Sequence, residues 1–257
     1  MSLKVSIITV CYNSESTIRD TIESIVTQSY ENIEYIIIDG QSSDKTLSIV
    51  KEYSEHIASI VSEPDNGIYD AMNKGLKLAA GDVIAFLNSD DFYESSKVIS
   101  DVVKCFSANT DTSIVMGDLV FVESSNLHKI VRFYSSLHFK PWKLRFGWMP
   151  PHTATFVLRS VYEKVGGFSL EYKIASDYEL FVRMLMVHKF SFVQINKVLV
   201  RMRAGGLSTS GIKNSLLLNS EIVKACKSHG VYTNLLFVLS KTPFKLFELF
   251  KSPKKSN

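Results

Sequence analysis

The chain contains 257 residues, of which 46% are hydrophobic and 21% charged, so it can bury a large core and is not a disordered protein. Its 29 Lys and Arg residues against 26 Asp and Glu residues give a formal charge of +3 at pH 7. This surplus is too small for a typical nucleic-acid-binding protein, and we expect no nucleic-acid partner. Three widely spaced cysteines without a CxxC pair indicate neither a disulfide framework nor a zinc site.

The opening segment, MSLKVSIITVCYN, is a strand-like apolar run that is too short for a signal peptide. No segment approaches the roughly 18 apolar residues that a membrane-spanning helix needs. We therefore expect a cytoplasmic protein.

The first hundred residues alternate short β-branched runs with helical patterns, which predicts βαβ units around a mainly parallel sheet. Strands are expected at 4–10, 35–39, 57–61 and 83–87. The first helix should be capped by Ser14 or Ser16 and run to about Thr27, and the second should start near Asp44. A third helix at 69–80 should end at Gly81, a residue free to adopt positive φ.

The second half is less regular. It should contain a helix at 97–107, a strand at 113–116, a hairpin joining 119–122 to 129–133, an aromatic-rich loop at 134–151, a strand at 155–158, helices at 160–165 and 177–187, and strands near Phe192 and Val198. The rest is helical. We divide the chain into a domain at 1–210, with halves at 1–117 and 118–210, and a C-terminal helical extension at 211–257.

Polar residues follow the expected parallel strands. In a parallel α/β sheet, ligands bind where the strands end, and the residues at these ends are Thr9-Val10-Cys11-Tyr12-Asn13, Asp39, Glu63 with Asp65, and Asn88 to Asp91. Neighbouring carboxylates are costly unless a cation or hydrogen-bond donors neutralise them. The adjacent Asp90 and Asp91 offer the oxygen ligands that Mg²⁺ or Mn²⁺ prefers.

Several of these residues also fit an ordinary structural role. Asp39-Gly40 and Asp65-Asn66-Gly67 are sequences typical of turns, and Asp44 is typical of a helix N-cap. Taken one at a time, none of them indicates a binding site.

Six segments in this order resemble the family 2 glycosyltransferases with the GT-A fold, most closely the bacterial members that build cell-surface polysaccharides. They are SIITVCYN, IIIDGQSSDKT, SEPDNGIYDAMNKG, FLNSDD, PPHTATFVLRSVYEKVGGF and IASDYELFVRML. The resemblance runs from Val5 to about Arg203. It implies a Rossmann-like, mainly parallel central sheet flanked by helices.

The resemblance also implies roles for residues in the first half. The nucleobase pocket would be lined by Thr9, Val10, Tyr12 and Asn13. Asp39 would accept a hydrogen bond from the base, and Asp65 would lie beside the base and ribose. Asn88, Ser89 and Asp90 stand where the family often has Asp-x-Asp, so Asp90 would hold the metal. The neutral Asn88 departs from that pattern and suits ribose contact rather than metal ligation, whereas ligation by Asp91 stays open.

In the second half, the resemblance implies that Asp177 is the catalytic base. The family often has two acids here, but Ser176 precedes Asp177 in this chain. The alternative is a plain N-cap role for Asp177. His152 is a candidate ligand of metal or diphosphate, with a structural histidine as the alternative. Arg203 is a candidate diphosphate ligand, as are Arg159 and Arg201.

The implied activity is inverting transfer of a sugar from a nucleotide-diphosphate sugar, with UDP favoured, to an acceptor hydroxyl on a lipid-linked or growing surface glycan. The implied cofactor is a divalent metal, Mn²⁺ or Mg²⁺. The alternative is a protein that binds sugar nucleotides without turning them over.

The C-terminal stretch is amphipathic. Leu235, Leu236, Leu239, Phe247 and Phe250 are able to share one helical face, with positive charge added by Lys241, Lys245, Lys251, Lys254 and Lys255. Pro243 should start a new helix. Basic amphipathic helices lie on anionic membranes, which predicts peripheral contact with the inner face of the cell membrane. Two alternatives stay open, packing on the protein's own core or on the second subunit of a homodimer.

Overall fold

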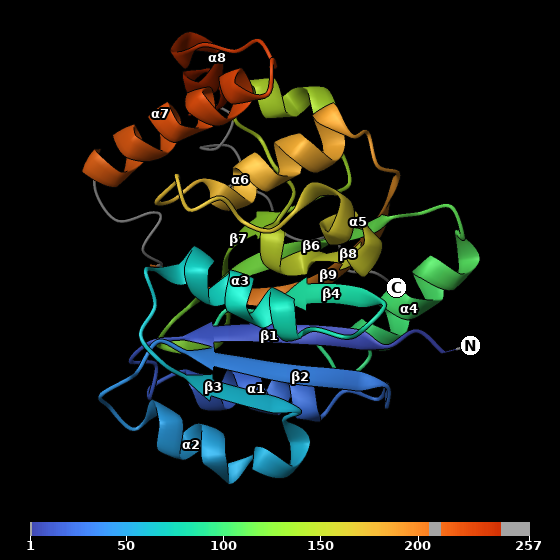
Figure 1. Ribbon diagram of the computed structural model, residues 1–257, viewed down its shortest axis with the longest axis vertical. Coiled ribbons are helices and arrows are strands. Elements are labelled where there is room, and N and C mark those ends of the chain that lie inside the picture. The colour runs from blue at the N-terminus through green and yellow to red at the C-terminus, as the bar shows by residue number, and fades with distance from the viewer. Residues whose placement is uncertain (1, 206–211, 243–257) are drawn as a thin grey trace.

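The computed structural model of the protein describes residues 2–205 and 212–242. Predicted features at Pro243, Lys245, Phe247, Phe250, Lys251, Lys254 and Lys255 lie outside these residues. Within them, a single nine-stranded sheet forms the centre of the molecule, with helices on both of its faces (Figure 1). None of the helices in this part of the chain is both long and apolar enough to cross a membrane.

The first half forms the parallel part of the sheet. Its strands are β1 (Val5–Cys11), β2 (Ile33–Asp39), β3 (Ser59–Ser62) and β4 (Val83–Phe86), arranged in the order β3-β2-β1-β4. They alternate with α1 (Ile18–Val26), α2 (Thr46–Glu52), the short η1 (Ser54–His56) and α3 (Ile68–Leu78). Strand β1 is buried along its whole length, as expected for a strand covered on both faces.

The second half continues the sheet with both strand directions. Its strands are β5 (Asp91–Tyr93), β6 (Ile114–Glu123), β7 (Asn126–Tyr134), β8 (Thr155–Leu158) and β9 (Phe192–Arg203). Beyond β4 the order is β8-β6-β9-β5, with β7 paired to β6. Strand β8 is antiparallel to β4 and β6, whereas β6 and β9 are parallel. The sheet is therefore parallel in its first half and mixed as a whole.

The helical segments of this half are α4 (Val98–Ala108), η2 (Pro141–Phe146), η3 (His152–Ala154), α5 (Arg159–Val165), α6 (Ser176–Phe181), the π-helical η4 (Val182–Val187), α7 (Ile212–Ser228) and α8 (Leu235–Leu239). Helices α7 and α8 lie above α6, on the side of the sheet away from α1 and α2 (Figure 1). The core accordingly has two parts, one on each face of the sheet.

In two places, a pair of strands predicted from the sequence is one continuous strand in the structure. The segments expected at 113–116 and 119–122 join as β6, and those near Phe192 and Val198 join as β9. The β6–β9 pairing shifts register between Met116 and Leu119, where a Cβ on Gly117 would lie 2.3 Å from Leu199. This shift of register thus interrupts the apolar pattern of the sequence without ending the strand.

Two predicted helix ends are wrong. Helix α1 has Thr17 at its N-cap with no side-chain cap, because the Ser14 carbonyl, rather than a serine hydroxyl, accepts from the N–H groups of Thr17 and Ile18. Helix α3 ends at Leu78 with Ala79 as its C-cap, before Gly81. Gly81 instead allows close approach to β1, since a Cβ there would lie 2.7 Å from the Ser6 nitrogen.

Candidate functional site

Tyr12, Gly40 and Asp65 meet where the parallel strands end. A Cβ on Gly40 would lie 2.4 Å from Asp65 Oδ2 and 3.5 Å from the Tyr12 ring, so only glycine allows the Asp65 carboxylate to approach the backbone this closely. Asp65 Oδ1 accepts the Gly67 N–H at 2.8 Å, which leaves Oδ2 directed over Gly40. Tyr12 is 65% exposed. An exposed aromatic ring beside a carboxylate oxygen offers stacking and hydrogen bonding to a nucleoside.

Asp39 lies at the end of β2 and is fully buried. Its Oδ1 accepts from the Cys11 thiol and the Ser42 hydroxyl, and its Oδ2 accepts from the Ser42 N–H and the Ser62 hydroxyl. Four donors fill the roughly four acceptor positions of a carboxylate. The implied hydrogen bond from Asp39 to a nucleobase is therefore not available in this structure, where Asp39 holds the loops after β2 and β3.

The other residues predicted after β1 divide into two groups. The side chains of Thr9 and Val10 are buried in the sheet, and the Thr9 hydroxyl accepts a hydrogen bond from Tyr35 at 3.2 Å, so neither side chain presents a surface to a nucleotide. Asn13 is exposed, with a positive φ of 48°. Its N–H donates to Ser42 Oγ and its Oδ1 accepts the Ser43 N–H, so it joins the loops that follow β1 and β2.

The loop from Asn88 to Asp91 follows β4. The Ser89 hydroxyl lies 2.8 Å from that of Ser14, which ties this loop to the one after β1. Asp90 is half-buried, and burial raises the pKa of its carboxyl group, opposed by its own backbone N–H and by Arg203. Asp91 is fully buried, and burial followed by the charge of Asp90 raises its pKa well above the usual range.

Asp91 consequently does not fit the predicted role of metal ligand. Its carboxyl group is enclosed beside Asn88, whose Nδ2 donates to Asp91 Oδ2 at 3.4 Å, and its backbone carbonyl accepts from Thr21 in α1. A ligand must be accessible to the cation, and its ionised form must be favoured. Asp91 is enclosed, and its burial disfavours the ionised form.

The arginines predicted as diphosphate ligands are engaged within the protein. The Arg203 side chain is 10% exposed and pairs with Asp20, while its Nη1 donates to the Asp90 carbonyl at 2.7 Å. Arg201 forms two hydrogen bonds with Glu94, and Arg159 bonds Glu163 and the Gly81 carbonyl. Arg203 therefore holds the Asp90 loop rather than presenting a free cation.

The donor set beside Asp90 fits a cation that is shared with a phosphate ligand. Among the described residues, no group of three or more His, Cys, Asp or Glu is able to hold a metal. Asp90 nevertheless offers one half-buried carboxylate. Asn88 Oδ1 and Asp91 Oδ1 beside it are buried acceptors without a donor in the described chain. Mg²⁺ typically binds one or two carboxylates together with substrate phosphates and water, which suits this set.

Asp177 is the second residue of α6 and is half-buried. Its Oδ1 accepts the Tyr178 N–H at 2.8 Å and lies 3.3 Å from the Tyr69 hydroxyl, whereas Oδ2 accepts no hydrogen bond from the described residues. Burial raises the pKa of Asp177 to about 6, with these hydrogen bonds opposing the shift and the charge of Glu221 adding to it. Ala175 rather than Asp177 occupies the N-cap, and the Asp177 carboxylate uses only Oδ1 for a backbone N–H of the first turn, that of Tyr178.

An aromatic cluster connects Asp177 with the end of β4. Phe168 stacks on Tyr69 with ring centroids 5.7 Å apart and packs edge-on against Phe86, two residues before Asn88. Tyr69 in turn contacts Asp177. The aromatic cluster thereby links Asp177 to α3 and to the end of β4.

His152 lies inside this cluster. Its ring stacks on Phe86 and meets Phe168 and Phe181 edge-on, and its Nε2 has no hydrogen-bond partner within the described chain. Burial lowers the pKa of His152 to about 4, so the ring is neutral at pH 7. It is thus not a cationic partner for diphosphate, and its unpaired Nε2 is enclosed within the protein.

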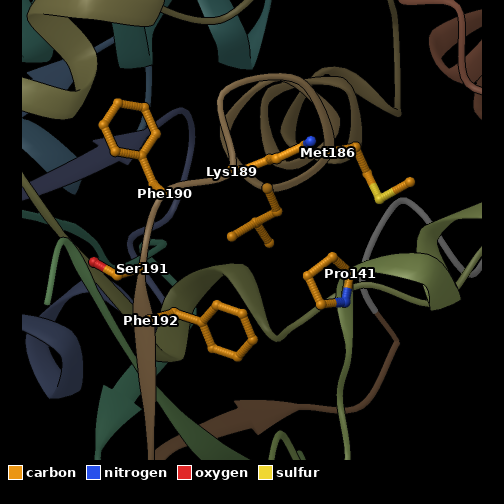
Figure 2. Close-up of a pocket in the computed structure, with 7 residues that line it drawn as sticks. Pro141, Met186, Lys189, Phe190, Ser191 and Phe192 are labelled. Carbon is orange, nitrogen blue, oxygen red and sulfur yellow. The ribbon is translucent and has the colours of Figure 1, made fainter.

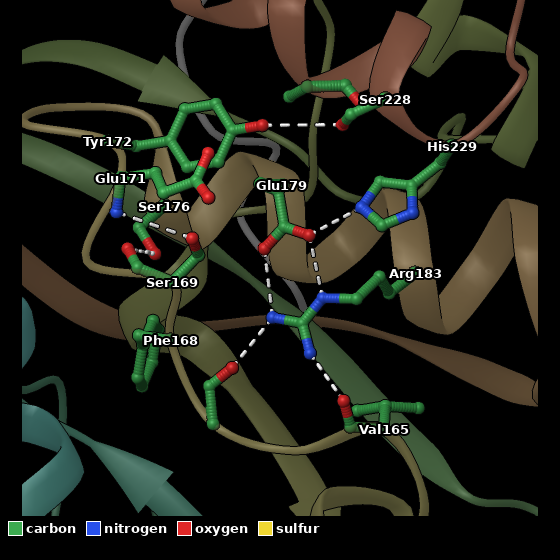
Figure 3. A network of polar contacts seen from close by, with 12 residues as sticks. Val165, Phe168, Ser169, Glu171, Tyr172, Ser176, Glu179, Arg183, Ser228 and His229 are labelled. Carbon is green, nitrogen blue, oxygen red and sulfur yellow. Dashed lines mark hydrogen bonds and ion pairs between the residues drawn. The ribbon is translucent and has the colours of Figure 1, made fainter.

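The end of α6 is anchored separately, by a network around Glu179 (Figure 3). Glu179 is buried and forms two hydrogen bonds with Arg183, and its Oε1 lies 2.5 Å from His229 Nε2 at the end of α7. Arg183 also donates to the carbonyls of Val165 and Gly167. This network fixes α6 against α5 and α7 without touching Asp177.

A hollow of about 510 Å³ lies away from these residues (Figure 2). It is lined mainly by apolar side chains, including Pro141, Leu185 and Phe190. Ser191 and Phe192 in its wall begin β9, and Phe192 is level with Ile84 at the start of β4 through the β6 and β8 pairings. The hollow therefore lies at the end of the strands opposite to the end that Asp90 follows.

Tyr69 and Gly40 were not singled out from the sequence as site residues. Both lie within the segments IIIDGQSSDKT and SEPDNGIYDAMNKG, so a signal was present. Their roles depend on contacts with Asp65 and Asp177, which only the folded chain defines.

Solved glycosyltransferase structures share this fold. Staphylococcus aureus TarS (residues 1–349) in complex with UDP-GlcNAc matches with a TM-score of 0.72 and 16% identity, over 96% of this chain and 75% of that one. The mannosyltransferase PcManGT from Pyrobaculum calidifontis, in complex with GDP-Man and Mn²⁺, matches with a TM-score of 0.68 and 17% identity, over 97% of this chain and 74% of that one. These likenesses confirm the GT-A type of fold.

Curated relatives match at the level of sequence. An uncharacterized glycosyltransferase of Mycobacterium tuberculosis (strain ATCC 25618 / H37Rv) is 33% identical over 185 residues, covering 71% of this chain and 69% of the relative. A PGL/p-HBAD biosynthesis glycosyltransferase of Mycobacterium bovis (strain BCG / Pasteur 1173P2) is 28% identical over 181 residues, covering 69% and 68%. The model of glycosyl transferase family 2 matches residues 6–166. The chain belongs to glycosyl transferase family 2.

Proposed function

We propose that this glycosyltransferase inverts the anomeric centre of a UDP-sugar and transfers the sugar to a hydroxyl of a lipid-linked or growing surface glycan. The observation that carries this proposal is the Asp177 carboxylate, which has one free oxygen and a pKa of about 6 and is linked to the end of β4 by the aromatic cluster. A carboxylate with that pKa is ionised at neutral pH and still basic enough to accept a proton.

The donor nucleotide is assigned to Tyr12, Asn13, Gly40 and Asp65, with Ser89 and Asn88 nearby. The close approach of Asp65 Oδ2 and the Tyr12 ring over Gly40 supports this assignment, because it brings a hydrogen-bond acceptor and an exposed aromatic ring together at the ends of the parallel strands. The Asp39 carboxylate supports the site indirectly, by holding Ser42 and Ser62. Thr9 and Val10 are left out because their side chains are buried.

The reaction is a single displacement. Asp177 Oδ2 removes the proton of the acceptor hydroxyl, whose oxygen forms a bond to the anomeric carbon as the bond from that carbon to the diphosphate oxygen breaks. The nucleoside diphosphate leaves with the electron pair, and attack from the opposite side inverts the centre. General-base catalysis of this type contributes about 10² to 10⁴ in rate.

Asp90 is the residue that would hold a divalent cation, Mn²⁺ or Mg²⁺, together with the donor's diphosphate. Such a cation, when bound, supplies stabilisation of the charge on the leaving diphosphate. Arg203 and Ser89 contribute by fixing the loop that carries Asp90.

Two substitutions test these roles. Asp177→Asn should bind UDP as wild type does and lose at least about a hundredfold in kcat, because only the proton acceptor is removed. Asp90→Ala should instead weaken UDP binding in the presence of Mn²⁺. Calorimetry with UDP and Mn²⁺ measures binding, and release of nucleoside diphosphate from a panel of nucleotide sugars measures turnover.

The result also separates this function from its alternative. An Asp177→Asn protein within a few-fold of wild-type turnover would remove Asp177 from the role of base. A wild-type protein that binds UDP and Mn²⁺ but releases no nucleoside diphosphate from any donor of the panel, with acceptor glycans present, would be a sugar-nucleotide-binding protein.

We place the protein at the inner face of the cell membrane through a surface that we name the α8 face. It consists of the exposed side chains of Trp142, Tyr232, Leu235, Leu236 and Leu239. Lys143 lies over the Trp142 ring and Arg145 over the Tyr232 ring, at 5.9 and 5.6 Å. Aromatic and basic residues beside exposed leucines suit an anionic bilayer surface.

One residue predicted for this surface does not belong to it. Lys241 is 6% exposed, and its Nζ donates to the Gly147 carbonyl at 3.2 Å, so it fixes α8 to the loop after η2 instead of adding surface charge. Stacking of Phe237 on Phe146, with ring centroids 4.9 Å apart, contributes to the same packing. The helix thus packs on the protein by one side and presents leucines on the other.

A further inference from the structure

Glu221, in the middle of α7, directs its carboxylate at the segment that precedes Asp177. Its Oε1 accepts the Lys173 N–H, and its Oε2 accepts the N–H groups of Ile174 and Ala175, each at 2.9 Å. Three successive backbone donors therefore converge on one side chain that is more than 40 residues away in the sequence. Asp177 follows two residues after Ala175.

These contacts are enclosed. Glu221 is 7% exposed, and no Lys, Arg or His of the described chain lies within ion-pair distance of its carboxylate, although the charge of Lys224 acts on it from one turn further along α7. A buried carboxylate is costly unless donors satisfy it. The three backbone N–H groups therefore stabilise the buried Glu221 carboxylate. Loss of these hydrogen bonds would release residues 173–175 and leave the carboxylate without donors.

The same segment is held from its other side by α3. The Tyr69 hydroxyl donates to the Ile174 carbonyl at 2.5 Å and also lies 3.3 Å from Asp177 Oδ1. Ile174 is therefore fixed through its N–H by Glu221 and through its carbonyl by Tyr69. Because α6 begins two residues later, the position of the Asp177 carboxylate depends on this clamp.

We infer that Glu221 is a positioning residue for the sugar-transfer reaction, holding residues 173–175 so that Asp177 presents its free oxygen to the acceptor hydroxyl. The inference rests on the proposed function, in which Asp177 is the base. It also means that α7, beyond the predicted domain boundary at residue 210, is a working part of the active site.

The Glu179 network makes the inference testable apart from folding. Glu179, Arg183 and His229 attach α6 to α7 independently of Glu221 (Figure 3). Loss of the Glu221 contacts should therefore displace Asp177 while α6 stays docked. The ionisable groups that act on Asp177 are Tyr69 from α3 and Glu221 from α7, and the charge of Glu221 raises the pKa of Asp177.

The test compares Glu221→Gln, Glu221→Asp and a control, Glu171→Gln, whose side chain is exposed and paired with Lys224. The donor is the nucleotide sugar of the panel from which wild type releases most nucleoside diphosphate. Glutamine cannot accept with its amide nitrogen, so at least one N–H loses its partner. We expect kcat to fall about ten- to a hundredfold with KM for the donor within about twofold.

The pH profile identifies the role. Removal of the Glu221 charge lowers the pKa of Asp177, so the acid limb of kcat should move to lower pH in Glu221→Gln. Glu221→Asp keeps the negative charge, but its side chain is one methylene shorter and reaches the three N–H groups less well. We therefore expect kcat to fall while the acid limb of its pH profile stays at the wild-type position. Glu171→Gln should match wild type in both.

Several results would overturn the inference. One is a folded Glu221→Gln protein with wild-type kcat and acid limb. Another is a Glu221→Gln protein in which kcat falls but the acid limb stays in place, if Glu179→Gln shows the same behaviour. Such a result would mean that Glu221 has only a structural role. If Glu221→Gln does not fold, wild-type kcat in Glu221→Asp decides against the inference. Failure of the proposed function is recognised separately, by turnover in Asp177→Asn.

Discussion

Asp177 combines a half-buried carboxyl group, one free oxygen and a neighbouring hydroxyl from Tyr69. Its pKa is raised by burial from 3.8 to about 6, so the ionised form prevails above that pH and the neutral form below it. A neutral carboxyl group cannot accept the acceptor's proton. We predict that kcat falls about tenfold for each pH unit below about 6 and is level above it, measured as nucleoside diphosphate release at saturating donor.

The histidine of the aromatic cluster supplies the control for this prediction. His152 has its pKa lowered to about 4, so His152→Asn should leave the acid limb near pH 6 in place. An acid limb centred near pH 4 in the wild-type protein would contradict the assignment to Asp177.

Gly40 determines the position of the Asp65 carboxylate, which we propose contacts the nucleotide. In Gly40→Ala the new Cβ would displace Asp65 Oδ2, which lies only 2.4 Å from its position. Loss of one hydrogen bond to a charged group costs about 1.5 to 3 kcal/mol, so UDP affinity should fall at least about tenfold in calorimetry. Gly230→Ala is the control, because its φ of +70° strains the backbone with no atom within 4 Å of the Cβ. Equal UDP affinity in Gly40→Ala and wild type would refute this geometry.

The sequence predicted a shared site for Asp65, Asp90 and Asp177, from strand ends for the first two and from the family resemblance for Asp177. It did not predict which polar side chains are already engaged. The Asp39 carboxylate already accepts hydrogen bonds from Ser42 and Ser62, and Arg203 already forms an ion pair with Asp20. Such commitments depend on partners that folding brings together, and Glu221 was missed for the same reason.

At the scale of elements, Gly81 connects the end of α3 with β1. A Cβ there would lie 2.6 Å from Ser6 Oγ and 2.8 Å from the Lys4 carbonyl, so the backbone would have to shift. Overpacking of this type costs about 1 to 3 kcal/mol. We predict that Gly81→Ala lowers the midpoint of urea unfolding accordingly, whereas Ala80→Ser, at an exposed neighbour, leaves it within error. An unchanged midpoint in Gly81→Ala would show that this contact is easily relieved.

The strands were easier to predict than the helix ends. Continuous apolar runs gave β1, β2 and β8 to within about two residues, because burial on both faces requires such runs. The predictions of the α1 cap and of the α3 end were wrong. A hydrogen bond to the Ser14 backbone carbonyl and a close backbone approach at Gly81 leave no distinctive pattern in the local sequence. Strands β6 and β9 were divided where their pairing shifts register.

For the molecule as a whole, the α8 face predicts binding to vesicles that contain an anionic phospholipid. Leu236 is 78% exposed, and burial of one leucine contributes about 1.5 to 3 kcal/mol. Leu236→Asp should therefore reduce co-sedimentation of the protein with phosphatidylglycerol vesicles by at least about tenfold in affinity. Leu78→Asp, at an exposed leucine that ends α3, is the matched control. A wild-type protein that stays in the supernatant would contradict membrane contact, and sedimentation velocity would then show whether the face joins two subunits.

The bond network of Arg203 has a consequence for the order in which the protein matures. Arg203 holds the Asp90 carbonyl from 113 residues further along the chain and pairs with Asp20 from 183 residues away. Contacts this distant form only after the intervening polypeptide has been synthesised and closed into a loop. A ribosome-bound chain that has already been synthesised as far as Asp91 accordingly lacks the support of the Asp90 loop until β9 has been translated.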